Sequence, residues 1–236
     1  DRAGMKNAPM KIGVIGCGNI SQQYFKNAPR FKNIKITACA SLHGSSAEAR
    51  AAEFGLRAIS VDEMLQDPET GLIVNLTVPA VHAEVSLRIL NAGKHVYSEK
   101  PLAVSLKDGK KILDLAAEKG LRVGCAPDTI LGDSHQLCRK LLDSGAVGQV
   151  VSGSAFIMSR GPEAWHPNPF FYYEKGGGPL FDMGPYYLSA LINFLGPVRS
   201  VSALTKTSFP DRIAGCKEHF GKKIKVKPDS YILKDG

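Results

Sequence analysis

Short apolar runs alternate with amphipathic stretches through the first half of the chain. The apolar runs at 10–15, 34–40, 72–78, 95–98 and 122–125 predict strands. The stretches at 20–27, 46–54, 62–65, 81–91 and 106–119 have the spacing of helices and end at glycine or proline in several cases. This alternation predicts an α/β fold, a doubly wound parallel sheet with helices on both faces.

The pattern changes after residue 127. Helices are predicted over 133–143 and 183–194, and long strands over 149–159 and 198–207. Lysines alternate with apolar residues over 223–227, which places the lysines on one face of a strand; we interpret this as a solvated face. We therefore predict a loose N-terminal segment 1–9, a first domain 10–127 and a second, α+β domain 128–236.

Composition and charge narrow the function classes. The chain has 44% hydrophobic and 22% charged residues, as ordinary globular proteins do. Five cysteines, an odd number without a C-x-x-C pair, favour reduced thiols over disulfides and predict no metal site. No apolar stretch is long enough for a membrane span, so we expect a cytoplasmic protein without a membrane partner. The net charge of +8 comes without a nucleic-acid-binding motif, so no nucleic-acid partner is expected.

A glycine-rich turn, GCGNIS at 16–21, directly follows the first predicted strand and opens the first predicted helix. Gly16 permits a tight turn, Gly18 lets the backbone approach a pyrophosphate, and Ser21 replaces the usual third glycine with a small side chain. In this context the turn predicts a dinucleotide-binding Rossmann domain. The predicted pyrophosphate contacts are Gly16, Gly18, Asn19 and Ile20.

The end of the second predicted strand distinguishes NAD from NADP, because a carboxylate there binds the ribose 2′-hydroxyl of NAD. Ser41 lies 20 residues after Ser21, and the segment 40–46 contains no acidic residue. Ser41 is therefore the predicted contact of the adenosine ribose. The cofactor is predicted to be NAD or NADP; nothing in this segment would repel a 2′-phosphate, which favours NADP, although no arginine adjoins it.

Two further segments carry a family resemblance. Residues 77–82 read TVPAVH, and residues 92–101 read AGKHVYSEKP. With the glycine turn, these segments resemble the glucose-fructose oxidoreductase, inositol dehydrogenase and rhizopine catabolism family, written Gfo/Idh/MocA. The resemblance implies an NAD(P)-dependent oxidoreductase that acts on a secondary alcohol or ketone of a sugar, polyol or related small molecule. It also implies a second domain built on a large open, mostly antiparallel sheet, here incomplete, through which a completed chain would form a homo-oligomer.

The resemblance places Lys100 near the nicotinamide and the substrate, where it would assist proton transfer. Hydride transfer from an alcohol also requires loss of the hydroxyl proton, and a cation stabilises the developing alkoxide. In the family the bond before Pro101 is often cis, which would fix the loop that aims Lys100. His82 either contacts the cofactor or caps the helix that begins there. The predicted cofactor residues on the nicotinamide side are Thr77, Pro79, His82, Glu99 and Lys100.

In the second domain, residues 176–186 match the family's G-G-G-x-x-x-D-x-G-x-H region except at its last position. Asp182 matches the substrate-contacting acid, but Tyr186 replaces the acid/base histidine. A free tyrosine has a pKa of about 10, against about 6.5 for histidine, so a tyrosine at this position is a poor general base at neutral pH unless Lys100 or the cofactor charge lowers its pKa. Three interpretations stay open: Tyr186 donates a hydrogen bond while Lys100 handles the proton, His166 substitutes, or the site does not turn over.

Other side chains are candidates for substrate contact. Asp128 follows the last strand of the first domain and either contacts substrate hydroxyls or caps a turn. Trp165, His166 and the aromatic residues 170–173 either line a sugar pocket or pack in a core. The predicted catalytic residues are Lys100, Asp182 and Tyr186. The alternative to an enzyme is a dinucleotide-binding sensor or interaction module that keeps the fold without catalysis.

Overall fold

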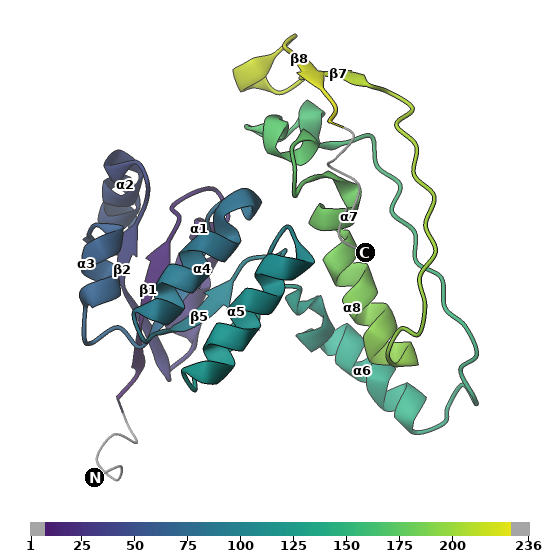
Figure 1. The fold of residues 1–236 in the computed structure, drawn as a ribbon, viewed down its shortest axis with the longest axis horizontal. Helices are drawn as coiled ribbons and strands as arrows, with labels where there is room; N and C mark the ends of the chain where they lie inside the picture. Colours follow the sequence, from purple (N-terminus) through teal and green to yellow (C-terminus); the bar gives the residue numbers. More distant parts are fainter. Residues whose placement is uncertain (1–7, 228–236) are drawn as a thin grey trace. The chain divides into compact units, whose positions relative to one another are not determined.

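The computed structural model describes residues 8–227, which divide between Ala126 and Pro127 into two compact units. Figure 1 labels helices and strands of both units. Residues 1–7 and 228–236 lie outside the described residues; they include most of the predicted loose segment 1–9 and the last part of the predicted second domain. None of the helices within residues 8–227 has both the length and the apolar composition needed to cross a membrane.

Unit 1 contains a six-stranded parallel sheet with the strand order β3-β2-β1-β4-β5-β6. The strands are β1 (Met10–Ile15), β2 (Ile34–Ala40), β3 (Arg57–Ala58), β4 (Leu72–Asn75), β5 (His95–Ser98) and β6 (Val123–Cys125). The order reverses between β1 and β4, so the loops after these strands diverge at the carboxyl edge of the sheet. The predicted doubly wound α/β fold is confirmed.

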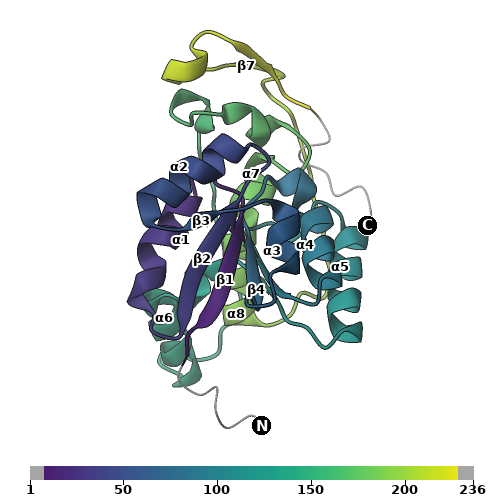
Figure 2. The ribbon, with the colours of Figure 1, turned by 90° about the vertical axis from the view of Figure 1, so that its left-hand side faces the viewer.

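Helices cover both faces of this sheet (Figure 2). Phe25 and Ala47, from α1 and α2, pack on one face in a cluster with Val14. Met64 and Ile112, from α3 and α5, are buried on the other face. Because both faces are covered, the central strands β1 and β4 are apolar over Ile12–Ile15 and Leu72–Val74, as the sequence showed. The helices are α1 (Ser21–Asn27), α2 (Gly44–Phe54), α3 (Val61–Gln66), α4 (His82–Asn91) and α5 (Leu106–Glu118), with short 3₁₀ turns at Ala28–Arg30 and Pro79–Val81.

Unit 2 is mainly helical and carries one antiparallel strand pair. Its helices are α6 (Asp133–Asp143), α7 (Gly178–Asp182) and α8 (Gly184–Leu195), and its strands are β7 (Asp211–Ile213) and β8 (Lys223–Lys225). Four 3₁₀ turns complete it: η3 (Asp128–Leu131), η4 (Pro162–Ala164), η5 (Pro169–Tyr173) and η6 (Lys217–His219). Ile224 and Val226 are buried while the three neighbouring lysines are exposed, which confirms the predicted solvated face.

The predicted strands at 149–159 and 198–207 are wrong in detail, because neither segment pairs with another strand among the described residues. Their apolar side chains are exposed instead: Val151 is 87% and Met158 is 91% solvent-accessible. Strand propensity reflects packing on a pleated, half-buried surface and does not create a strand without a hydrogen-bonded neighbour. Of the expected large antiparallel sheet, the described part of unit 2 contains the β7–β8 pair.

Candidate functional site

The glycine turn after β1 has the geometry that a dinucleotide needs. Gly16 has φ +108°, and a Cβ there would lie 2.5 Å from the backbone of Leu76, so no other residue fits without displacement. A Cβ at Gly18 would meet no protein atom within 4 Å, which leaves space for a bound group to approach the backbone. The hydroxyl of the buried Ser21 donates to the Gly18 carbonyl at 2.7 Å and braces the turn. The turn therefore fits a dinucleotide pyrophosphate.

The loops that follow four parallel strands meet at one edge of the sheet. Backbone hydrogen bonds continue from strand to loop along this edge: Gly16 N to Ala40 O at 2.8 Å, Leu76 N to Ile15 O at 2.7 Å, and Glu99 N to Asn75 O at 2.9 Å. The predicted cofactor residues Asn19, Ile20, Ser41, Thr77, Pro79, Glu99 and Lys100 all lie in these loops. The edge thus brings together residues that are up to about 80 positions apart in the sequence.

Asn75, which the sequence analysis did not single out, is the buried centre of this edge. Its Oδ1 accepts hydrogen bonds from the Thr77 backbone at 3.2 Å and from the Thr77 hydroxyl at 2.6 Å. Its Nδ2 donates to the His82 carbonyl at 3.0 Å and to Ser86 Oγ at 3.1 Å. The available signal was an asparagine in the middle of the largely apolar run 72–78. Asn75 fixes the loop after β4 against the start of α4.

His82 is placed differently from both hypotheses in the sequence analysis. Its side chain is fully buried, with Nδ1 2.7 Å from the Pro101 carbonyl oxygen and Nε2 2.8 Å from the Thr77 carbonyl oxygen. Both ring nitrogens are engaged by backbone, so the ring has none left for a cofactor contact. The first turn of α4 also has no side-chain cap. His82 instead links the loop after β4 to the loop after β5.

The loop after β5 carries the lysine that the resemblance made the main catalytic candidate. The Lys100–Pro101 bond is cis, as the resemblance implied. Glu99 is engaged through both carboxylate oxygens: Oε1 accepts from the Tyr24 hydroxyl and Oε2 from the Lys100 backbone, each at 3.0 Å. Glu99 therefore ties the loop to α1. Lys100 itself is half-buried.

Two thiols lie next to the candidate cofactor edge. Cys17 is buried within the glycine turn. Two effects raise the pKa of its thiol: a hydrogen bond with Cys39, which has the larger effect, and burial. Cys125 ends β6, and burial raises its pKa to about 11. Both groups are therefore protonated at neutral pH and are poor nucleophiles.

The predicted substrate residues belong to unit 2, whereas Lys100 belongs to unit 1. Asp182 is the last residue of α7 and Tyr186 lies in the first turn of α8, and both are half-buried. Asp128 is exposed in η3, and Trp165 is 70% exposed. His166 Nδ1 accepts from the Asn168 backbone at 3.0 Å. Its ring packs against Trp165 and Phe171, at centroid distances of 5.5 and 5.0 Å.

A buried ion pair in unit 2 escaped the sequence analysis. Glu163 accepts hydrogen bonds from the Tyr173 hydroxyl and from Arg212, whose Nε lies 2.8 Å from Oε1. Burial opposes the charge on Glu163, but the bonds from Tyr173 and Arg212 outweigh it and lower the pKa of the carboxyl. The neighbours Tyr172 and Tyr173 are core residues, together with Ala214 and other small or branched side chains. The aromatic run 170–173 is thus at least partly core.

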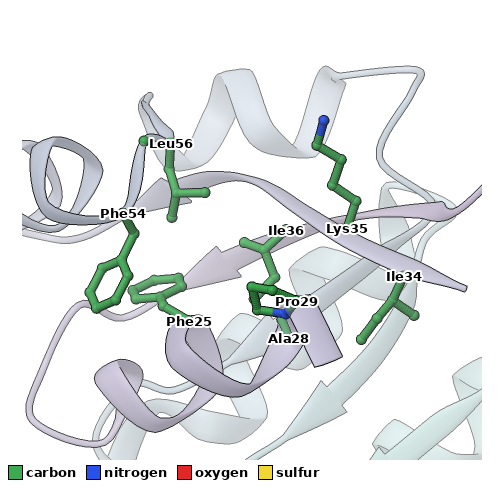
Figure 3. Close-up of a pocket in the computed structure, with 9 residues that line it drawn as sticks. Phe25, Ala28, Pro29, Ile34, Lys35, Ile36, Phe54 and Leu56 are labelled. Atoms are coloured by element: carbon green, nitrogen blue, oxygen red, sulfur yellow. The ribbon is translucent and has the colours of Figure 1, made fainter. Parts of the chain in front are cut away.

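An apolar pocket of about 270 Å³ in unit 1 is separate from the cofactor edge (Figure 3). It lies over the first half of β2, between the end of α1 and the end of α2, whereas the glycine turn and Ser41 follow the ends of their strands. Lys35 is its one charged lining residue. The other lining residues are Phe25, Ala28, Pro29, Ile34, Ile36, Phe54, Gly55 and Leu56. This pocket lacks the converging polar groups of the strand-end loops.

Comparison with known proteins adds independent information. A dTDP-3,4-didehydro-2,6-dideoxy-alpha-D-glucose 3-reductase from Streptomyces violaceoruber is 33% identical over 193 residues, which are 79% of this chain and 55% of that protein. A solved 3-ketoreductase from Actinomadura kijaniata, in complex with NADP and TDP-benzene, is 26% identical with a TM-score of 0.68, over 80% of this chain and 58% of that chain. A solved biliverdin reductase from Synechocystis sp. PCC 6803, in complex with biliverdin and NADP+, is 26% identical with a TM-score of 0.65. The match covers 81% of this chain and 60% of that chain.

This chain spans little more than half the length of these relatives. Two family models nevertheless match most of it. Residues 10–126 match the model described as an oxidoreductase family with an NAD-binding Rossmann fold, and residues 135–229 match the GFO/IDH/MocA C-terminal domain. These matches confirm the predicted family, fold class and nicotinamide-dinucleotide type of cofactor. The chain belongs to the Gfo/Idh/MocA oxidoreductase family.

Proposed function

We propose that this protein transfers a hydride between NAD(P) and a secondary alcohol or ketone of a sugar, polyol or related compound. The observation that carries the proposal is the arrangement at the sheet edge. A turn with open space at Gly18 leads into α1, and Tyr24 of α1 donates to Glu99 in the Lys100 loop, which His82 also holds at Pro101. When bound, the nicotinamide supplies or accepts the hydride.

The chain's own residues bind and orient the dinucleotide. Gly16 and Gly18 hold the turn open for the pyrophosphate, with Asn19 and Ile20 exposed beside them. Ser41, directly after β2, contacts the adenosine ribose. Thr77 and Pro79 face the nicotinamide side of the edge. The absence of an acidic residue over 40–46 favours NADP, and the similar ketoreductase and biliverdin reductase structures contain NADP.

Lys100 handles the proton that hydride transfer from an alcohol leaves behind. Its neutral amine accepts the hydroxyl proton while the hydride leaves the alcohol carbon. In the reverse direction its ammonium group polarises the ketone oxygen and returns the proton to it. Asp182 and Tyr186 contact substrate hydroxyls, and Tyr186 donates a hydrogen bond in place of the family histidine. Asp128, Trp165 and His166 are further candidates for substrate contact. A cytoplasmic location and a homo-oligomeric state stay predictions.

The test begins with fluorescence titrations of NADH and NADPH, followed by a screen of sugars, polyols and their ketones for turnover. With a substrate in hand, Lys100→Ala should lower kcat by about 10²–10⁴-fold, the usual contribution of positioned proton transfer. Cofactor affinity should change much less. Unchanged turnover in Lys100→Ala would contradict the assigned mechanism. If the wild type binds cofactor but turns over no compound, and Tyr186→His then does, the native chain acts as a binding module.

A further inference from the structure

A buried imidazole spans the two loops that carry the candidate nicotinamide residues. His82 Nδ1 faces the Pro101 carbonyl at 2.7 Å, and Nε2 faces the Thr77 carbonyl at 2.8 Å. Carbonyl oxygens only accept hydrogen bonds. A neutral imidazole donates to one of them, and an imidazolium donates to both. In either form the ring sets the distance between the two loop backbones, because it is rigid and has no solvent-exposed surface.

The loops that His82 joins each lead directly to a proposed cofactor residue. Thr77 is the second residue after β4, and its side chain and amide are held by Asn75. Pro101 follows Lys100 directly in the sequence, so fixing the Pro101 carbonyl restricts the backbone that carries the lysine. The Asn75 side chain also holds the His82 carbonyl at 3.0 Å. The ring is therefore anchored at its own backbone as well as at both nitrogens.

We propose that His82 is a positioning residue that fixes the separation of the Thr77 and Lys100 loops and thereby preorganises the site for the nicotinamide half of the cofactor. The proposal rests on the proposed function and deepens it. It assigns His82 no contact with the cofactor, in contrast to the sequence-based hypothesis. The loops keep their places before binding, so binding does not have to order them.

The same unit contains a matched control for this bridge. Lys94 is also buried, and its Nζ donates to two backbone carbonyls, Asp67 O at 2.6 Å and Thr70 O at 2.8 Å. Lys94 precedes β5 and Thr70 precedes β4, so this bridge joins the amino ends of the strand pair whose carboxyl ends His82 joins. Removing the Lys94 side chain leaves both of its carbonyl partners without that donor, and removing the His82 ring leaves at least one of its carbonyl partners without one. Only the His82 bridge lies at the cofactor edge.

The experiment compares His82→Leu, His82→Gln and Lys94→Met with the wild type. We would measure the Kd values of NADH and NADPH by fluorescence, the Tm, and amide hydrogen exchange by mass spectrometry. His82→Leu and Lys94→Met should both lower the Tm, since each removes the donor of at least one buried or partly buried carbonyl. Only His82→Leu should weaken the preferred cofactor, by about tenfold, the order of magnitude for removing a group that orients a binding residue. His82→Gln keeps an amide donor for one carbonyl. Its Tm and its cofactor affinity should therefore lie between those of the wild type and those of His82→Leu.

Hydrogen exchange separates this proposal from the proposed function. In the protein without cofactor, His82→Leu should speed exchange at 77–81 and 100–104, while Lys94→Met should speed it at 67–72 instead. If the wild type binds neither dinucleotide but this exchange pattern holds, the proposed function fails and the positioning role stands. Equal loss of affinity in Lys94→Met and His82→Leu would overturn the positioning role, as would unchanged affinity and exchange in His82→Leu.

Discussion

The two units differ in whether their extended segments pair with neighbouring strands. In unit 1 every strand pairs with a parallel neighbour, and helices bury both faces of the sheet. In unit 2 the extended segments 149–159 and 198–207 pair with no strand among the described residues, and apolar side chains such as Val151 are exposed. Unit 1 is organised around strand ends that converge on a site, and unit 2 around a buried ion pair that joins distant segments. A hydrophobic run becomes a strand only where the fold supplies its neighbour.

The largest effect is expected at the glycine turn of unit 1. Gly16→Ala places a methyl group 2.5 Å from the Leu76 backbone at a positive φ, so we expect a loss of about 3 kcal/mol or more and no measurable cofactor binding. Gly18→Ala is the matched control, since its methyl group meets no protein atom. It should keep its stability and lose cofactor affinity. Urea unfolding and NADPH titration measure the two effects. Equal stability of the two variants would show that the turn tolerates a side chain at residue 16.

A smaller effect, confined to unit 2, is expected from Glu163→Gln. The substitution removes the charge that pairs with Arg212 and leaves that guanidinium without its carboxylate, which should cost about 2 kcal/mol because the pair is only partly buried. Hydrogen exchange should rise at 212–216 and stay unchanged in β1. Asp211→Asn, which breaks an exposed pair with Lys223, is the control and should cost less than about 1 kcal/mol. A Glu163→Gln protein as stable as the wild type would contradict the stabilising role of this pair.

The smallest expected effect is the pH dependence of the stability that Glu163 provides. The pKa of Glu163 is lowered in the folded protein, because the bonds from Tyr173 and Arg212 outweigh the effect of burial. Its stabilisation is therefore fully present above the ordinary glutamate pKa of about 4.3 and is lost as the pH falls through the lower folded value. The stability difference between wild type and Glu163→Gln should be constant from pH 7 to about 5 and narrow at lower pH. A difference that widens on acidification would reverse the assigned direction of the pKa shift.

The sequence predicted the elements of unit 1 to within about three residues except β3, which it missed, and it failed at two long strands of unit 2. In unit 1 helices connect the successive strands, and every connection except β3–α3–β4 returns the chain to a neighbouring strand, so local periodicity contains much of the information. In unit 2 the partners of an extended segment are distant or outside the described residues. The hydrophobic pattern at 149–159 is equally compatible with a paired strand and with an exposed extended chain.

The candidate site likewise contains residues that sequence motifs predicted and residues whose roles depend on contacts in the folded chain. Gly16, Gly18, Ser41 and Lys100 were found from motifs, because each motif encodes a local backbone requirement or a family role. Asn75 was missed and the role of His82 was misjudged. Their importance comes from contacts across the strand ends, such as the His82 ring with Pro101, 19 residues away.

The sequence by itself determined the family, the order of strands and helices in unit 1, and the turn that fits a dinucleotide. Those features depend on short-range spacing and on the backbone freedom of glycine. The tertiary structure decided which polar side chains hold the site together and which join segments of unit 2. Glu163 meets Arg212 across 49 positions, and no local pattern predicts that pair. Buried polar groups must find partners wherever the fold brings donors and acceptors together, so their roles follow from the folded chain.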